Sequence, residues 1–209
     1  MATTVIVSYD GTDNDRDALA LARVFARAGA ALELAYVRHS ADDRTEAPVL
    51  TNGENGLPMH VVLSGSTPEG LRELAAERDS PLVVFGSEYR TAKGHVDPQR
   101  SARRLIEGGP IAVALAPAGL ASNGGFDVRT IGAIGEDGDP CVLETAEVLA
   151  ARLGGEVAPR ATKDVDLLVV GSKPGAVTGR VTISAAAEYL IELARCPVVV
   201  LPRGVALAF

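Results

Sequence analysis

The sequence predicts an α/β fold in which a mostly parallel, doubly wound sheet is covered by helices on both faces. Short β-branched or apolar runs alternate with segments whose apolar residues recur at helical spacing. Runs such as residues 81–86 are apolar throughout, as expected for strands buried between two helix layers. With 47% hydrophobic and 22% charged residues, the composition of the 209-residue chain is typical of a folded globular protein.

The first part of the chain predicts a complete α/β unit with helical crossovers between its strands. Five strands are expected, at residues 3–9, 31–37, 59–65, 81–86 and 110–117. A first helix should end at Gly29, where the apolar spacing stops at a glycine. A second should begin in Ser66-Thr67-Pro68-Glu69, an N-terminal helix pattern, and a third near Ser101. The polar, turn-rich residues 38–57 are expected to form a loop.

After a small-residue linker at residues 118–127 the pattern restarts, which indicates an internal duplication. The aligned pairs are Asp10-Gly11 with Asp137-Gly138, Gly86-Ser87 with Gly171-Ser172, and Gly94 with Gly179. The second copy is shorter, with room for only one short strand between Leu153 and Asp164. We therefore expect a complete domain at residues 1–117 and a shortened one at 128–209. The second would lack the second helix and third strand, and bury an exposed sheet edge against the first copy.

Four segments carry a resemblance that covers nearly the whole chain. They are VIVSYDGTDNDRDALALA, LVVFGSEYR with GHVDPQRSARRLI, IGAIGEDGDP, and LLVVGSKPG with GRVTISAAAEYLIELARCPVVVLPRG. In this combination the chain resembles a tandem universal stress protein of the actinobacterial kind. The resemblance implies parallel five-stranded domains of strand order 3-2-1-4-5, paired as in a dimer, and a role in stress-related regulation instead of catalysis.

The resemblance also implies a nucleotide site. In nucleotide-binding members an Asp at the end of the first strand lies beside adenine and ribose, and a loop of form G-x2-G-x9-G-(S/T) wraps the phosphates. Glycines in such a loop let the backbone approach the anion, which free N–H groups and a helix dipole then stabilise.

Both loops of this chain match that pattern only in part. In the first copy Asp10 and Gly86 match, Tyr89 takes the place of the second glycine, and Gln99-Arg100 replace the final pair. In the second copy Asp137 and Gly171 match, whereas Ser184-Ala185 replace the final pair. Pro174, at the second glycine of that copy, has no backbone N–H to donate.

The candidate ligand-binding residues lie at strand ends and in the two loops. They are Asp10, Val37, Gly86, Gly94, Arg100, Ser101, Asp137, Gly171, Gly175, Gly179 and Ser184. The expected ligand is ATP or AMP, with Mg²⁺ in the case of ATP. The first copy is favoured because an adenine pocket needs neighbouring strands that the second copy lacks.

Other interpretations of these residues stay open. Each Asp-Gly pair can form a turn and cap the next helix, and Gly86 and Gly171 can serve tight turns. Arg100 can neutralise a phosphate or fill an emptied pocket. A chain without ligand would instead act as a pseudo-dimer that docks another protein. A weak hydrolase rests on fold analogy alone.

Charge and composition argue against several other functions. A net charge of −7 argues against nucleic-acid or anionic-membrane partners. No stretch approaches about 18 apolar residues, so we expect a cytoplasmic protein. Cys141 and Cys196 are far apart and are expected to be reduced, and the three histidines show no metal spacing. We expect no enzyme, and either a homodimer or an intramolecular pseudo-dimer.

Overall fold

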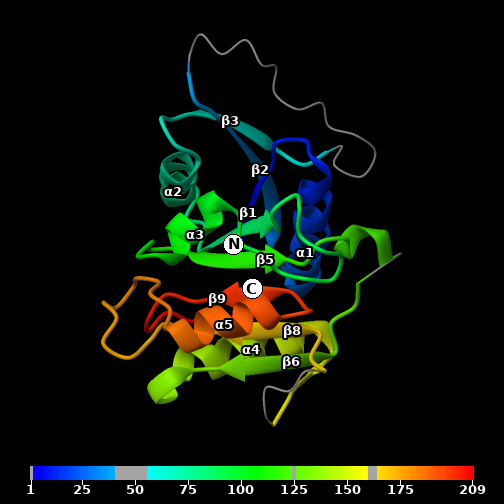
Figure 1. Ribbon diagram of the computed structural model, residues 1–209, viewed down its shortest axis with the longest axis vertical. Coiled ribbons are helices and arrows are strands. Elements are labelled where there is room, and N and C mark those ends of the chain that lie inside the picture. Colours follow the sequence, from blue (N-terminus) through cyan, green and yellow to red (C-terminus); the bar gives the residue numbers. More distant parts are fainter. Residues whose placement is uncertain (1, 41–55, 124–125, 160–163) are drawn as a thin grey trace.

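The computed structural model describes residues 2–40, 56–123, 126–159 and 164–209, without the side chains of Asn123 and Asp137. Within these residues nine strands form one continuous sheet of order β3-β2-β1-β4-β5-β9-β8-β6-β7 (Figure 1). The predicted α/β class with a mostly parallel sheet is therefore confirmed. Most of the predicted loop at residues 38–57 lies outside the described residues, and β2 extends through Arg38.

The sheet consists of two parallel halves that meet at one antiparallel seam. The strands are β1 Thr4–Ser8, β2 Ala31–Arg38, β3 Met59–Leu63, β4 Leu82–Gly86, β5 Ala112–Ala116, β6 Thr130–Ile134, β7 Glu156–Val157, β8 Leu167–Val170 and β9 Val198–Val200. At the seam β5 and β9 run antiparallel, with Ala114 opposite Val199. We call residues 2–123 the first half and residues 126–209 the second half. One sheet edge of the second half, β9, is thus buried against the first half, whereas β7 forms an outer edge.

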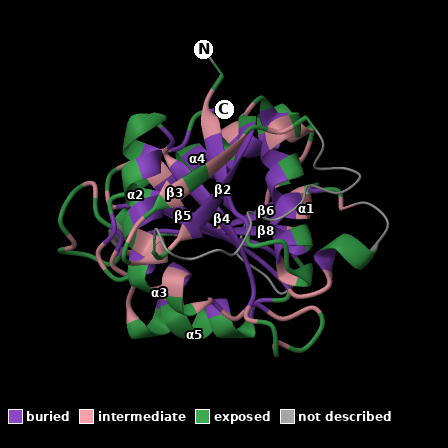
Figure 2. Cartoon of the chain, turned by 90° about the horizontal axis from the view of Figure 1, so that it is seen from above, coloured by how far each residue is buried: buried purple, intermediate pink, exposed green. Residues whose placement is uncertain are grey.

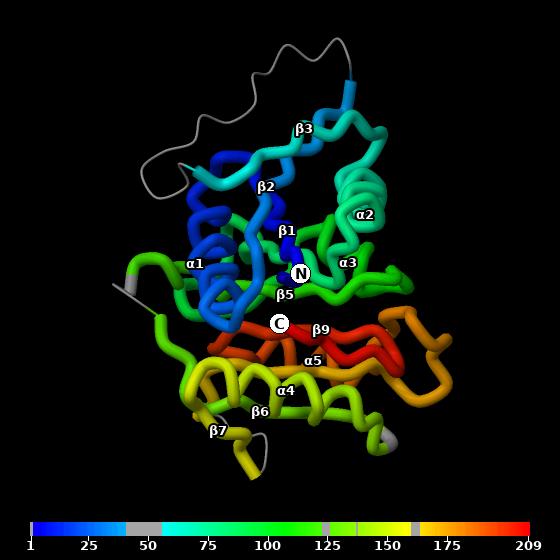
Figure 3. Tube along the Cα trace, turned by 180° about the vertical axis from the view of Figure 1, so that it is seen from behind, coloured from blue at the N-terminus to red at the C-terminus, as the bar shows by residue number. Residues whose placement is uncertain are grey.

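Five α-helices among the described residues cover both faces of the sheet (Figures 1 and 3). They are α1 Asp13–Ala28, α2 Thr67–Glu77, α3 Arg100–Ile106, α4 Pro140–Leu153 and α5 Ala185–Leu193. The core between α1, α4 and the sheet contains Val7, whereas the core under α2, α3 and α5 contains Ile6. The side chains of successive strand residues therefore pack into the cores on opposite faces of the sheet. Figure 2 shows the buried sheet between helices whose outer surfaces are exposed.

The described part of the predicted linker is fastened to α1. Residues Leu120–Asn123 form a short 3-10 helix, in which the Leu120 side chain is buried. The buried carboxylate of Asp17 on α1 accepts hydrogen bonds from the backbone N–H groups of Gly119, at 2.7 Å, and Ala121, at 2.8 Å. The chain thus leaves the first half along a defined path.

The last residues cross the seam on the face that carries α1 and α4. The Phe209 ring stacks on Phe25 of α1 with ring centroids 5.5 Å apart, and Thr3 Oγ1 donates to the Ala208 carbonyl at 2.7 Å. The Leu207 N–H donates to Thr145 Oγ1 of α4 at 3.0 Å. This tail therefore links a helix of the first half to a helix of the second.

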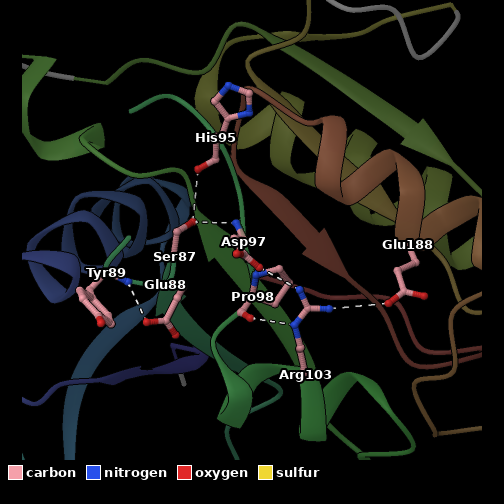
Figure 4. A network of polar contacts seen from close by, with 8 residues as sticks. All are labelled: Ser87, Glu88, Tyr89, His95, Asp97, Pro98, Arg103 and Glu188. Carbon is pink, nitrogen blue, oxygen red and sulfur yellow. Dashed lines mark hydrogen bonds and ion pairs between the residues drawn. The ribbon is translucent and has the colours of Figure 1, made fainter. Parts of the chain in front are cut away.

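On the opposite face Arg103 of α3 connects the two halves (Figure 4). Its Nε donates to the Pro98 carbonyl at 3.1 Å, and its Nη2 lies 2.8 Å from Asp97. Its Nη1 lies 3.7 Å from Glu188 Oε1 of α5, across the seam. The side chains of Arg103, Asp97 and Glu188 are all partly exposed, so we treat the Arg103–Glu188 pair as a contact that orients the two halves and adds little stability.

A partly buried charge network at the outer edge of the first half predicts a pH effect. Glu33 of β2 accepts two hydrogen bonds from Arg78, at 2.6 and 2.8 Å, and contacts His60 Nε2 at 2.8 Å. Hydrogen bonding from Arg78 lowers the pKa of Glu33 from its ordinary value of 4.5, against the opposing effect of burial.

Because the pKa of Glu33 is lower in the folded chain, its stabilisation is complete above pH 4.5 and is lost as the pH falls through the folded value. We expect Glu33→Gln to reduce the free energy of unfolding at pH 7, and the gap to wild type to narrow in acid. Urea unfolding between about pH 7 and pH 3 measures this gap. A gap that stays constant over the whole range would contradict the assignment.

Candidate functional site

The candidate site lies at the carboxyl edge of the first half. Strand β1 pairs in parallel with β2 on one side and with β4 on the other, so the residues that follow these three strands meet at the same edge of the sheet. Ligands of open α/β sheets often bind at such a point, where the strand order reverses. Two pockets open there. One, of about 400 Å³, lies between the starts of α2 and α3 and we call it the α2–α3 pocket; the other, of about 500 Å³, borders the start of α1 and we call it the α1 pocket. The consecutive residues Gln99 and Arg100 line one pocket each.

The α2–α3 pocket carries positive charge and hydroxyl groups. Its described lining is His39, Gly65, Ser66, Thr67, Pro68, Arg100, Ser101 and Arg104, which includes no acidic residue. Arg100 and Arg104 are exposed and lie one turn apart on α3. The first turn of α2 points its N-terminal end at the same space, and such an end favours an anion. The pocket is therefore suited to a negatively charged group.

His39 is held at the rim of this pocket. Its Nδ1 donates to the Ser64 carbonyl at 3.3 Å, which leaves Nε2 facing Thr67 Oγ1 at 3.5 Å. The imidazole follows directly on β2, so the end of that strand and the start of α2 border the pocket together.

The α1 pocket is acidic. Its described lining contains four carboxylates, those of Asp10, Asp13, Asp15 and Glu88, and no lysine or arginine. Burial, and then the neighbouring Asp15 carboxylate, raise the pKa of Asp10. A phosphate would be repelled here, whereas a neutral or hydrogen-bond-donating part of a ligand would be tolerated.

The backbone at the end of β1 already binds an internal anion. Asp15 is buried, and its Oδ2 accepts from the N–H groups of Asp10, at 2.9 Å, and Thr12, at 2.8 Å, and from the Thr12 hydroxyl at 2.8 Å. Burial raises the pKa of Asp15, and these hydrogen bonds oppose that rise. The carboxylate that caps α1 is therefore that of Asp15, not that of Asp10, which leaves the Asp10 side chain exposed at the pocket.

The glycine loop of the first half satisfies several of its own N–H groups, among them that of Asp97 (Figure 4). Ser87 Oγ donates to the Ala116 carbonyl at 2.7 Å and accepts from Asp97 N at 3.2 Å. Glu88 N donates to the Asp97 carbonyl at 2.9 Å, and Gly94 N donates to the Ala118 carbonyl at 2.8 Å. These groups are therefore not free to wrap a phosphate in this conformation.

The two residues of the first loop that stand in place of motif glycines, Tyr89 and Gln99, have different surroundings. Tyr89 is exposed, and the Arg90 guanidinium lies 5.0 Å from the centroid of its ring. Gln99 precedes α3, and its Nε2 reaches back to the Ser87 carbonyl at 3.4 Å. Gln99 thus closes the loop between the two pockets.

Glycine is required at several positions of both loops by the geometry of the chain itself. A Cβ added at Gly86 would lie 2.1 Å from the Asn14 carbonyl oxygen, and one at Gly171 would lie 2.5 Å from Val142 Cγ2. Gly94, Gly175 and Gly179 have φ values of 82°, 75° and 78°, which favour glycine. Ligand contact at these five positions stays a prediction.

The loop of the second half repeats the hydrogen bonds of the first. Ser172 Oγ donates to the Leu201 carbonyl at 2.8 Å and accepts from Thr182 N at 3.1 Å. Lys173 N donates to the Thr182 carbonyl at 2.7 Å. Ser87 and Ser172 therefore anchor their loops in the same way, a role that sequence reasoning did not assign to either serine.

An internal carboxylate also lies at the start of α5. Ser184 caps α5 by accepting from Ala187 N at 3.1 Å, and its hydroxyl donates to Glu136. Asp139 caps α4, accepts from Gly204 N at 3.0 Å and lies 3.6 Å from Arg203. The place where a phosphate would meet α5 is therefore bordered by Glu136.

The predicted site residues are distributed over both halves. Arg100 and Ser101 line the α2–α3 pocket and Asp10 the α1 pocket next to it, whereas the Val37 side chain is buried in the core with α2. The Asp137 side chain lies outside the described residues. Sequence reasoning assigned no binding role to the other six described lining residues of the α2–α3 pocket, of which four have polar side chains: His39, Ser66, Thr67 and Arg104. Their signal was weak, because they come from three separate segments of the chain: the end of β2, the start of α2 and α3.

Other chemistry receives no support from the described residues. They contain no group of three or more His, Cys, Asp or Glu side chains placed to hold a metal ion, and no helix with the length and apolarity needed to cross a bilayer. Cys141 and Cys196 are not joined by a disulfide, and burial raises the pKa of the Cys196 thiol to about 11.

Comparison with known proteins supports the fold. No protein-family model and no curated protein matches the chain. Among solved structures, a universal stress protein from Archaeoglobus fulgidus DSM 4304 matches with TM-score 0.61 and 14% identity, covering 96% of this chain and 98% of its own. A protein of unknown function from Pseudomonas aeruginosa PAO1 matches with TM-score 0.66 and 13% identity, covering 97% and 93%.

A third structure, from Pseudomonas aeruginosa UCBPP-PA14, bears the universal stress protein name provisionally. It matches with TM-score 0.64 and 13% identity, covering 97% of this chain and 94% of its own. At these identities the matches show a shared fold over nearly the whole length of each chain. The protein therefore has the fold found in solved universal stress protein structures.

Proposed function

We propose that the protein is a tandem regulatory binding protein of the universal stress type, whose first half binds an adenine nucleotide without turning it over. The observation that carries this proposal is the α2–α3 pocket. There Arg100 and Arg104 lie beside the N-terminal end of α2, at the sheet edge where Asp10 follows β1. The shared fold and the repeated serine anchors support the tandem interpretation.

The charge distribution suggests how the nucleotide lies. Its phosphate would contact Arg100, Arg104 and the hydroxyls of Ser66 and Ser101, because the α1 pocket on the other side is acidic. The nucleoside would extend toward Asp10 and His39. Since the N–H groups of Glu88, Gly94 and Asp97 in the glycine loop are engaged, charge on side chains would replace their contact with the phosphate. We therefore expect AMP to bind at least as well as ATP with Mg²⁺.

Thermal unfolding with AMP, ADP, and ATP with or without Mg²⁺ tests the proposal. A ligand that binds only the folded chain stabilises it by about 2.7 kcal/mol at 100 times its Kd. We expect the increase in Tm to shrink in Arg100→Ala and Arg104→Ala and to disappear in the double variant. Arg72→Ala is the matched control, because Arg72 is exposed on α2 and does not line the pocket.

Two results would contradict nucleotide binding at this pocket. One is a wild-type protein whose Tm no nucleotide changes at millimolar concentration. The other is a nucleotide effect that the double variant keeps in full. Release of phosphate from ATP in step with protein concentration, abolished in Asp10→Ala, would instead contradict a purely binding role.

A ligand-free docking module is the second candidate function. The observation in its favour is that internal carboxylates occupy the N-terminal ends of α1 and α5. Asp15 accepts the N–H groups after β1, and Glu136 binds Ser184 at the start of α5. Under this proposal nucleotides leave the Tm unchanged, and function depends on an exposed surface.

A further inference from the structure

The outward side of α5 is apolar and exposed. Tyr189 is 61% exposed, Leu190 37% and Leu193 56%, and Ala185 and Ala186 are exposed beside them. We call these five residues the α5 face. Figure 2 shows the exposed outer surface of this helix at the rim of the molecule. The opposite side of α5, with Ala187 and Ile191, is buried in the core.

Comparison with α3 explains why this face is uncovered. Counting from Ser87 and Ser172, Leu105 of α3 corresponds to Leu190 of α5. In the first half α2 packs against α3, and Leu105 is only 1% exposed. In the second half no helix lies between β7 and β8 among the described residues, so the corresponding Leu190 has no such cover.

The uncovered helix is also the more apolar of the two. The positions that are Arg100, Ser101, Arg104 and Gly108 in the first half are Ala185, Ala186, Tyr189 and Leu193 in the second. Solvent exposure alone would favour the opposite change. The helix without a covering neighbour, α5, therefore carries more apolar side chains than the covered helix α3. Such an exposed apolar cluster is typical of an interaction surface.

We propose that the α5 face binds the same face of a second copy of this chain, with the two helices antiparallel about a two-fold axis. The face is self-complementary in size, because small Ala185 and Ala186 lie at its N-terminal end and large Leu190 and Leu193 toward its C-terminal end. An antiparallel pair places the large end of each helix over the small end of the other, as an isologous interface requires.

Charge is compatible with the same arrangement. Glu188 in the first turn is already paired with Arg103 across the seam, and the C-terminal end of α5 carries both Glu192 and Arg195. An antiparallel pair would bring Arg195 of each copy toward Glu136 of the other, which is bound to Ser184 at the N-terminal end. This interface is separate from the β5–β9 seam, which already occupies those sheet edges within one chain.

The expected dimer is concentration-dependent, because a single helix pair buries an area at the low end for stable complexes. Analytical ultracentrifugation of the full chain should show the 21.6 kDa monomer at low concentration and twice that mass at high concentration. Leu193→Gln should raise the dimer Kd at least about tenfold, a loss typical of removing one large apolar contact from a small interface. Leu63→Gln is the matched control, because Leu63 on β3 is an exposed leucine like Leu193, with 59% of its surface exposed, and lies outside the α5 face.

A charge exchange tests the antiparallel register. Ala186 of one copy would lie near Leu193 of the other, so Ala186→Glu and Leu193→Lys should each abolish the dimer, and the double variant should restore it. Circular dichroism would confirm that every variant is folded. A wild type that stays monomeric up to millimolar concentration, a dimer unaffected by the α5 variants or equally weakened by Leu63→Gln, or a double variant that stays monomeric would overturn the proposal.

Discussion

Replacing Gly86 by alanine should cost about 3 kcal/mol or more of unfolding free energy, at the upper end for overpacked sites. The new Cβ would lie 2.1 Å from the carbonyl oxygen and 2.7 Å from the carbonyl carbon of Asn14. These are backbone atoms in the first turn of α1, which Asp15 holds to the Asp10–Thr12 turn by three hydrogen bonds. The turn cannot yield without breaking that cap.

Urea unfolding of two further alanine variants controls this prediction. Gly171→Ala should cost less, because its Cβ would meet the end of a side chain, Val142 Cγ2, at 2.5 Å. Gly65→Ala should be nearly neutral, since no heavy atom lies within 4 Å of the added Cβ. Equal losses for Gly86→Ala and Gly65→Ala would show that α1 does not press on the end of β4.

Phe209→Ala should destabilise the protein by about 3–5 kcal/mol, the usual cost of truncating a buried phenylalanine. Its ring is buried and stacks on Phe25, a fully buried residue of α1, at 5.5 Å. The same tail donates a hydrogen bond to Thr145 of α4, so the loss also loosens the connection between α1 and α4.

Equilibrium unfolding in urea measures the loss, and the shape of the transition reports on the two halves. If the tail couples them, Phe209→Ala should broaden the transition or lower its m-value. Phe209→Leu should restore most of the stability because it refills the space. A loss below about 1 kcal/mol in Phe209→Ala, well under the usual cost, would contradict a coupling role.

Local signals in the sequence were sufficient for most helix and strand positions. Gly29 ends α1 with a φ of 117°, and the Ser66-Thr67-Pro68 pattern begins α2, because both effects act over a few residues. The antiparallel seam between β5 and β9 was not predicted as such. Both strands are apolar throughout, so neither pattern specifies its partner or its direction.

The candidate site was predicted only where one segment supplies it. Arg100 and Ser101 stood out because they interrupt a known loop pattern within a single stretch of chain. His39, Ser66 and Arg104 come from three segments that meet only in the folded protein, so no spacing relates them. The capping role of Asp15 was hidden because Asp10 comes first after the strand and has the same side chain.

The contact between Arg103 and Glu188 affects which halves can pair with each other. The two residues stand equally far beyond Ser87 and Ser172, so they are the same position in each half, and they face each other across the seam. A pair of identical first halves joined in this way would set arginine against arginine, and a pair of second halves glutamate against glutamate. The opposite charges therefore favour the pairing of a first half with a second half over the pairing of two identical halves.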